Sequence, residues 1–85
     1  MKFISALDIM PGDVIAWAYD GFSGDRSIPE IKPFPSSLVY YEVTEIYRDH
    51  MGTIVYGKGF SKDGERHRNY DFVPGDREIL LIKRI

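Results

Sequence analysis

The chain has 85 residues, no cysteine and a formal net charge of −2. This length predicts one domain over residues 1–85 with a modest core, and the lack of cysteine excludes disulfides and thiolate metal sites. The charge balance argues against general affinity for nucleic acid, whose phosphates require clustered lysine and arginine.

The N-terminal part predicts two strands joined by a tight turn. Residues 1–7 are typical of a short edge strand. Pro11 and Gly12 predict a type II turn, because proline fixes φ at its second position and glycine accepts positive φ at its third. Residues 14–19 then predict a strand that is apolar on both faces. We expect both faces of this strand to be covered, with Trp17 in the core.

Residues 20–37 predict a long loop. Three prolines and two glycines exclude a regular helix or a central strand. Loops of this length in a compact domain are often functional. Two roles remain open for the large apolar residues of this loop: they cap one end of the fold, or they bind a partner protein. These residues are Phe22, Ile28, Ile31 and Phe34.

The next stretch predicts a β-hairpin. Residues 38–48 and 53–60 are rich in β-branched and aromatic residues and flank a short connection that contains glycine. In the second strand Gly57 and Gly59 share a face with valine and threonine. Two glycines on one face predict either a sharp bend or the close approach of another backbone.

The first hairpin strand breaks its own alternation. Tyr41 and Val43 share one face, but the next strongly apolar residue is Ile46, which is out of step by one position. An extra residue near Thr44 and Glu45 would restore the face, so we predict a β-bulge there.

The C-terminal part predicts two more strands. Asp63 and Gly64 indicate a turn, and residues 65–72 form a strand after it. Pro74 and Gly75 indicate a further turn before the last strand at 79–82.

This order of strands and turns resembles SH3-like small barrels of bacterial or bacteriophage proteins. The resemblance rests on residues 11–15, Pro-Gly-Asp-Val-Ile, on residues 70–76, Tyr-Asp-Phe-Val-Pro-Gly-Asp, and on the hairpin between them. It implies an all-β fold: a strongly bent antiparallel barrel of about five strands with one long proline- and glycine-containing loop. It also implies binding to proteins or nucleic acids rather than catalysis.

One cluster combines basic and aromatic residues. Aromatic side chains interleaved with cations suit single-stranded nucleic acid, because bases stack on rings while phosphates meet cations. The competing interpretation places Tyr56 and Phe60 in the core and leaves the charged residues solvated on the other side. The candidate nucleic-acid-binding residues are Lys58, Lys62, Arg66, His67 and Arg68.

No residue pattern predicts an enzyme. Ser61, His67 and Asp71 have the chemistry of a nucleophile triad, but nothing in the sequence brings them together. His50 and His67 are too few to form a zinc site without carboxylate ligands. We therefore expect no catalytic residue, metal or cofactor.

The sequence favours a non-catalytic binding module, of phage or prophage type, that engages another protein. The contact would use the 20–37 loop, or self-association through an exposed strand edge. The alternative is a barrel that binds single-stranded nucleic acid through residues 56–68. No apolar run reaches membrane-spanning length or matches a signal peptide, so we expect a cytoplasmic protein and no membrane partner.

Overall fold

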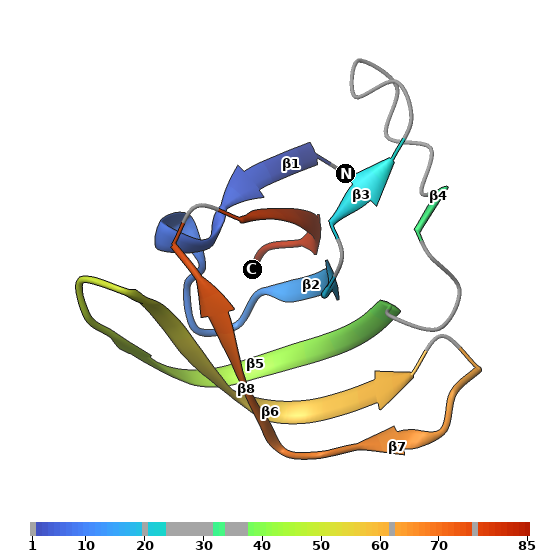
Figure 1. Cartoon of the computed structure of the whole chain (residues 1–85). Helices are drawn as coiled ribbons and strands as arrows, with labels where there is room; N and C mark the ends of the chain where they lie inside the picture. Colours follow the sequence, from blue (N-terminus) through green and yellow to red (C-terminus); the bar gives the residue numbers. More distant parts are fainter. Residues whose placement is uncertain (1, 20, 24–31, 34–37, 62, 76) are drawn as a thin grey trace.

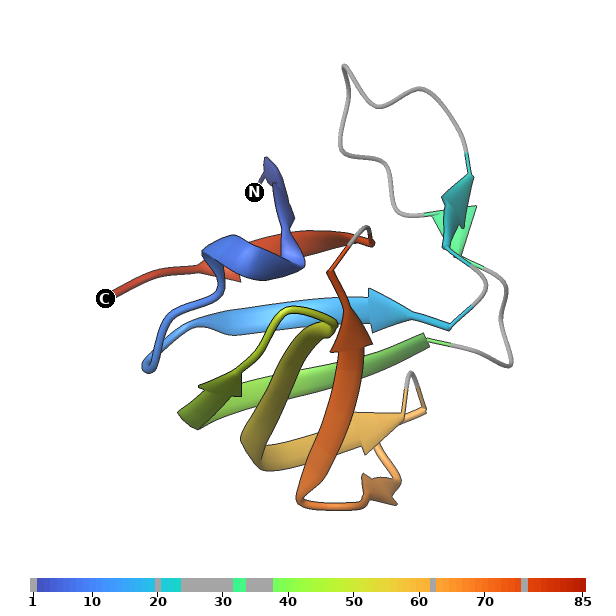
Figure 2. The same ribbon diagram turned by 60° about the vertical axis from the view of Figure 1, so that its left-hand side comes forward.

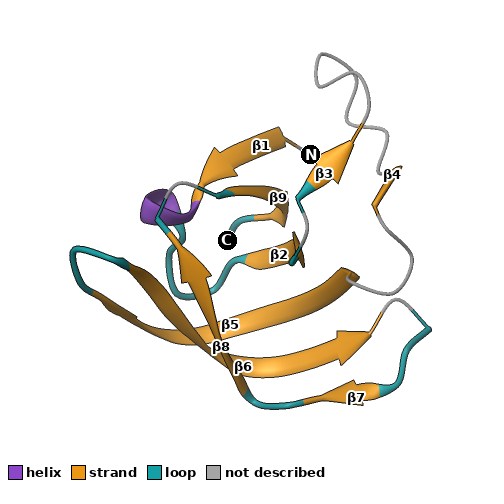
Figure 3. Ribbon diagram, viewed as in Figure 1, coloured by secondary structure: helices purple, strands orange, loops and turns teal. Residues whose placement is uncertain are grey.

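The computed structural model describes residues 2–19, 21–23, 32–33, 38–61, 63–75 and 77–85, with the backbone alone at 22–23 and 32–33. Over these residues the chain is all-β, as predicted, and its single helical element is one 3-10 turn (Figure 3). No helix within the described ranges is long and apolar enough to cross a membrane.

One antiparallel sheet contains most of the strands (Figure 1). It runs β1-β9-β2-β5-β6, and β7 and β8 both pair with the far side of β6. The strands are β1 (Lys2–Ser5), β2 (Val14–Ala18), β5 (Leu38–Arg48), β6 (Gly52–Ser61), β7 (Arg66–His67), β8 (Tyr70–Pro74) and β9 (Glu78–Lys83), and the 3-10 turn η1 is Ala6–Asp8.

The sheet bends strongly but is not closed into a barrel, so the predicted closure is wrong. Among the described residues no strand pairing joins β8 to β1, and these two strands are the ends of the ladder. The 3-10 turn η1, which follows β1, instead makes hydrogen bonds to β6 and to the residue before β9. The amide of Ala6 donates to the carbonyl of Arg77 at 3.1 Å, and the hydroxyl of Thr53 donates to the carbonyl of Ala6 at 3.0 Å.

The long loop contains a second, two-stranded sheet. β3 (Phe22–Ser23) pairs with β4 (Lys32–Pro33), and Figure 2 shows this pair set apart from the main sheet. Its strands are too short to serve as a central strand, in line with the prolines and glycines around them. The predicted binding residues Ile28, Ile31 and Phe34 lie outside the described residues.

The predicted hairpin and its bulge are confirmed. β5 pairs with β6 over nearly its whole length, and the register shifts between Val43 and Glu45, which leaves Thr44 as the inserted residue. Gly57 lies opposite this bulge with φ 152°. A Cβ at Gly57 would lie 2.0 Å from the carbonyl oxygen of Glu42, so only glycine lets the two strands approach here.

The core has two parts, one on each face of β2, as the two apolar faces of that strand predicted. Trp17 lies in the larger cluster inside the bend and is 2% exposed. Ala16 and Ala18 lie in a smaller cluster on the other face with Leu38 and Leu80.

The segment before β2 is fixed to the rest of the fold by one buried carboxylate. Both oxygens of Asp13 accept from Arg84 at 2.9 Å, and Asp13 also accepts from the amide of Met10 at 2.8 Å. Burial alone would raise the pKa of Asp13, but these hydrogen bonds outweigh burial and lower that pKa. The predicted turn is confirmed, since Gly12 has φ 94°.

The strand predicted at 65–72 is two strands instead of one. β7 ends at His67, β8 begins at Tyr70, and both keep the same register against β6. At the interruption, the hydroxyl of Tyr41 shares its proton between the carbonyls of Arg68 and Tyr70, at 3.2 Å each.

Candidate functional site

The outer face of β5, β6 and β8 carries two adjacent rows of large side chains. Directly paired residues of antiparallel strands share a face of the sheet. One row is Tyr47, Ile54 and Phe72, and the next is Glu45, Tyr56 and Tyr70. The exposed fractions are 61% for Tyr47, 54% for Tyr70, 41% for Phe72 and 39% for Tyr56. We call these two rows the aromatic face.

The interpretation that placed Tyr56 and Phe60 in the core is wrong. Tyr56 is exposed, and Phe60, on the same side of β6, is only partly buried. The inner face of β6 carries Thr53, Val55 and the two glycines instead. A Cβ at Gly59 would lie 2.8 Å from the ring of Tyr41, so this glycine makes the space that the tyrosine ring fills.

The charged residues beside the aromatic face are divided between its two sides. Glu42 and Glu45 are exposed on β5. Lys58 lies opposite Glu42 in the register, and Arg66 lies on β7 at the other side of β6. The acidic side chains therefore lie along one side of the face and the basic ones along its centre and the other side.

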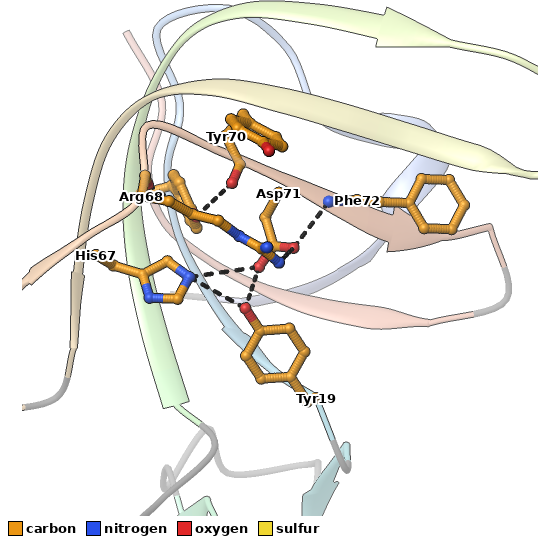
Figure 4. Close-up of polar contacts among 7 residues, drawn as sticks. Tyr19, His67, Arg68, Tyr70, Asp71 and Phe72 are labelled. Atoms are coloured by element: carbon orange, nitrogen blue, oxygen red, sulfur yellow. Dashed lines mark hydrogen bonds and ion pairs between the residues drawn. The ribbon is translucent and has the colours of Figure 1, made fainter.

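A polar cluster lies directly behind the aromatic face, around the carboxylate of Asp71 (Figure 4). Asp71 is 2% exposed and lies on the inner side of β8. It accepts a short hydrogen bond from the hydroxyl of Tyr19, one from Arg68 at 2.8 Å and one from the amide of Phe72 at 2.9 Å. Buried charges of this kind need several partners, and Asp71 has them.

His67 joins this cluster from β7. Its Nε2 lies 3.1 Å from the hydroxyl of Tyr19 and 3.8 Å from the nearer oxygen of Asp71. Because the hydroxyl of Tyr19 donates its hydrogen bond to Asp71, a hydrogen on Nε2 of His67 would donate to the tyrosine oxygen. The ring of His67 also meets Tyr41 edge-on, with 6.0 Å between centroids.

Two tyrosines near Asp71 are held in their neutral form. Burial, followed by the hydrogen bond to Asp71, raises the pKa of Tyr19 to about 12. Burial, followed by the negative charge of Asp71, also raises the pKa of Tyr41. Ionising either ring would place a second negative charge beside the carboxylate.

The cluster also holds Arg68 beside one ring of the aromatic face. With one nitrogen bound to Asp71, the guanidinium lies 5.5 Å from the centroid of the Tyr70 ring, within cation–π range. Tyr70 lies 6.4 Å from Tyr56 by ring centroids. The buried carboxylate therefore helps to fix the orientation of two exposed rings.

The structure places the predicted nucleic-acid-binding residues in different settings. Lys58 is exposed beside Tyr56, and Arg66 is exposed and donates to Asn69 at 3.0 Å. His67 faces inward and Arg68 is paired with Asp71. Lys62 lies outside the described residues, as does the side chain of Phe22 in the predicted protein-binding loop.

The fold brings His67 and Asp71 together, but Ser61 does not lie with them. Their common neighbour is Tyr19, while the hydroxyl of Ser61 accepts from the amide of Glu65 at 3.2 Å. Among the described residues no group of three His, Asp or Glu side chains could hold a metal ion.

Sequence reasoning missed three of the four exposed rings, those of Tyr47, Tyr70 and Phe72. The alternation in β6 contained the information needed. Once the glycine face is placed inside, the pairing across β6 turns these rings outward. The partnership of Tyr19 with Asp71 joins residues far apart in the chain and has no local pattern.

Comparisons of the chain with protein-family models, with curated proteins and with solved structures found no match in any of the three.

Proposed function

We propose that this protein is a non-catalytic binding module that engages another protein through its aromatic face. The observation that carries the proposal is the exposure of four neighbouring rings on one rigid sheet surface. Tyrosine is enriched in protein interfaces because its ring gives a large contact area at a low cost in conformational entropy. Exposed apolar groups that are contiguous in this way mark interaction sites.

The contacts that hold the rings of the aromatic face in place also support the proposal. Binding sites on rigid elements lose less conformational entropy on binding than sites on loops. Tyr70 is fixed by Arg68, and Arg68 in turn by the buried carboxylate of Asp71. The face is therefore organised before a partner arrives.

An SH3-like type, as found in short bacterial and phage proteins, belongs to the same proposal, here as an open sheet. Five strands, β2, β5, β6, β8 and β9, bend around the larger core cluster, with the bulge at Thr44 and the tight approach at Gly57 at the bend. Barrels of this kind serve as binding modules, which supports a non-catalytic role.

Single-stranded nucleic acid remains a second candidate, because Tyr56 shares its exposed face with Lys58. Stacking on the rings would be sequence-tolerant, and a cation beside them would meet phosphate. The charges weigh against this candidate: Lys58 faces Glu42 across the strands, Arg68 is paired with Asp71, and Glu45 lies in the ring row itself. We therefore rank protein above nucleic acid.

Affinity selection of a random peptide library on the immobilised protein tests the proposal. We expect the wild-type protein to enrich peptides and the double variant Tyr47→Ser, Phe72→Ser to lose them. The loop variant Phe22→Ala, Phe34→Ala and the control Ile85→Ser, at a residue that is 99% exposed, should both retain them.

Two results would contradict this assignment of the site. Loss of the peptides only in the loop variant would move the site to residues 20–37. Salt-sensitive retention of single-stranded DNA that requires Tyr56 and Lys58, with no peptide enriched, would favour nucleic acid instead.

A further inference from the structure

We propose that the guanidinium of Arg77 and the indole N–H of Trp17 together form a binding site for an organic carboxylate. This inference goes beyond the proposed function, because Trp17 lies inside the bend of the sheet and neither residue belongs to the aromatic face. It is carried by two neighbouring hydrogen-bond donors, neither of which has an acceptor among the described residues.

The first donor is the indole of Trp17, on β2. The residue is 2% exposed, and within the described part of the chain its buried Nε1 has no hydrogen-bond partner. An indole nitrogen can only donate. Buried donors in proteins are nearly always paired, because a buried N–H without an acceptor has lost its hydrogen bonds to water and gained none in return. The indole N–H is therefore available to an acceptor that a ligand supplies.

The second donor is the guanidinium of Arg77, which lies against the same ring. Its Cζ is 5.9 Å from the centroid of the Trp17 ring, and the residue is half-buried. No carboxylate or carbonyl of the described residues pairs with this guanidinium, whereas Arg68 and Arg84 are each bound to a buried aspartate. Arg77 therefore carries a positive charge that the described fold leaves unbalanced.

The backbone of Arg77 is fixed, but its side chain is not held by a hydrogen bond. The amide donates to the carbonyl of Pro74, and the carbonyl accepts from the amide of Ala6, at 3.1 Å each. The guanidinium reaches Gly21, where a Cβ would lie 3.4 Å from Nη1. Only the side chain of Arg77 would therefore need to move to admit a ligand beside the indole.

The chemistry of these two donors favours a carboxylate. A guanidinium presents parallel N–H groups that match the two oxygens of a carboxylate. Because the guanidinium lies against the indole ring, a carboxylate bound to Arg77 can also accept from Nε1 of Trp17. The single unpaired cation balances one negative charge, while the nearby Arg68 is already paired with Asp71. The ring of Tyr19, edge-on to Trp17 with 5.4 Å between centroids, adds an apolar surface for the body of the ligand.

The chain has one tryptophan, so a nitrogen-15 correlation spectrum shows one indole N–H signal, and this signal reports on the site directly. The wild-type protein is titrated at constant pH and ionic strength with phenylacetate, and with phenylacetamide as the neutral matched control. A second pair of probes is an N-acetylated dipeptide that ends in phenylalanine, and its C-terminal amide. The two acids distinguish a free carboxylate from the carboxyl terminus of a peptide.

We expect at least one acid to shift the indole signal downfield and to saturate with a dissociation constant below about 10 mM, while its amide does not. Arg77→Gln should bind the acid at least about tenfold more weakly, because it loses both the charge and the paired N–H groups. Arg77→Lys, which keeps the charge alone, should fall between the two. Arg66→Gln is the control at an exposed arginine and should bind as the wild type does. Circular dichroism checks the fold of each variant.

Three outcomes would overturn the inference. The indole signal could stay unchanged at about 50 mM of either acid, the amides could shift it as the acids do, or folded Arg77→Gln could bind as the wild type does. Each of these results concerns the Trp17 site alone. Selection of peptides through Tyr47 and Phe72 is measured separately, so the proposed function and this inference can fail independently.

Discussion

Tyr41 and Tyr56 belong to the same hairpin and lie on its opposite faces. Tyr41 is fully buried and donates its hydroxyl to two backbone carbonyls, whereas Tyr56 exposes 39% of its surface beside other rings. The difference does not come from the residue type. It comes from Gly59, which leaves space for the Tyr41 ring inside the bend. Changes on the inner face should therefore alter stability, and changes on the outer face should alter binding.

The largest loss of stability is expected from Gly57→Ala, on the inner face. The new Cβ would lie 2.0 Å from the carbonyl oxygen of Glu42, and the backbone at Gly57 has φ 152°. Neither strand can move without breaking the pairing around the bulge. We expect a loss of about 3 kcal/mol or more in the free energy of unfolding, measured by urea denaturation.

Gly64→Ala is the matched control for this variant. Gly64 also has positive φ, 82°, but its Cβ would meet nothing within 4 Å. Backbone strain alone should cost about 1 kcal/mol. Equal losses in the two variants would show that strain, and not the close approach of the strands, makes Gly57 necessary.

A smaller loss is expected for Tyr41→Phe. The variant keeps the buried ring and removes only the hydroxyl that serves the carbonyls of Arg68 and Tyr70. Buried carbonyls without a donor cost about 1–3 kcal/mol, so urea denaturation should show a loss in that range. Tyr56→Phe, the partner variant on the outer face, should change stability by less than about 0.5 kcal/mol. Similar losses for both variants would contradict the contrast between the two faces.

Alkaline pH tests the two inner tyrosines, Tyr19 and Tyr41, because both resist ionisation in the folded protein. Burial and Asp71 raise the pKa of Tyr19 from 10.0 to about 12. Its contribution to the free energy of unfolding is therefore complete below pH 10 and is lost as pH rises toward 12. The pKa of Tyr41 is raised as well, so its contribution acts in the same direction. The free energy of unfolding should therefore fall as pH rises above 10.

Urea denaturation at a series of alkaline pH values measures this fall. Tyr19→Phe should make the fall shallower, because one of the two groups no longer ionises, and Tyr56→Phe serves as the control on the outer face. A fall of unchanged steepness in Tyr19→Phe would remove Tyr19 from the explanation.

Local patterns in the sequence were enough to predict the features that depend on neighbouring residues. The out-of-step Ile46 located the bulge, because a two-residue alternation cannot slip without an inserted residue. Pro11 and Gly12 located a turn with positive φ. The two apolar faces of β2 predicted burial of Trp17 and Ala16 alike.

Features that depend on distant residues were not predicted. The barrel was expected to close, but among the described residues no strand pairing joins β8 to β1, and Ala6 of η1 bonds Arg77 and Thr53 instead. The residues that share each face of β6 were identified correctly, but the sequence left open whether Tyr56 pointed into the core or outward. The inner face is the one with the glycines, and Gly59 makes space there for the ring of Tyr41, which comes from another strand.

The smallest effect on stability is expected for Tyr47→Ser, Phe72→Ser, which alters the aromatic face alone. Both rings are largely exposed and lie outside the core clusters, so unfolding should change by less than about 1 kcal/mol. Binding of peptides should nevertheless disappear, because these side chains supply the apolar centre of the contact. Urea denaturation and peptide selection with the same sample give both values. A variant that unfolds as readily as Gly57→Ala would show that these rings stabilise the fold, and the separation of roles between the faces of the hairpin would not hold.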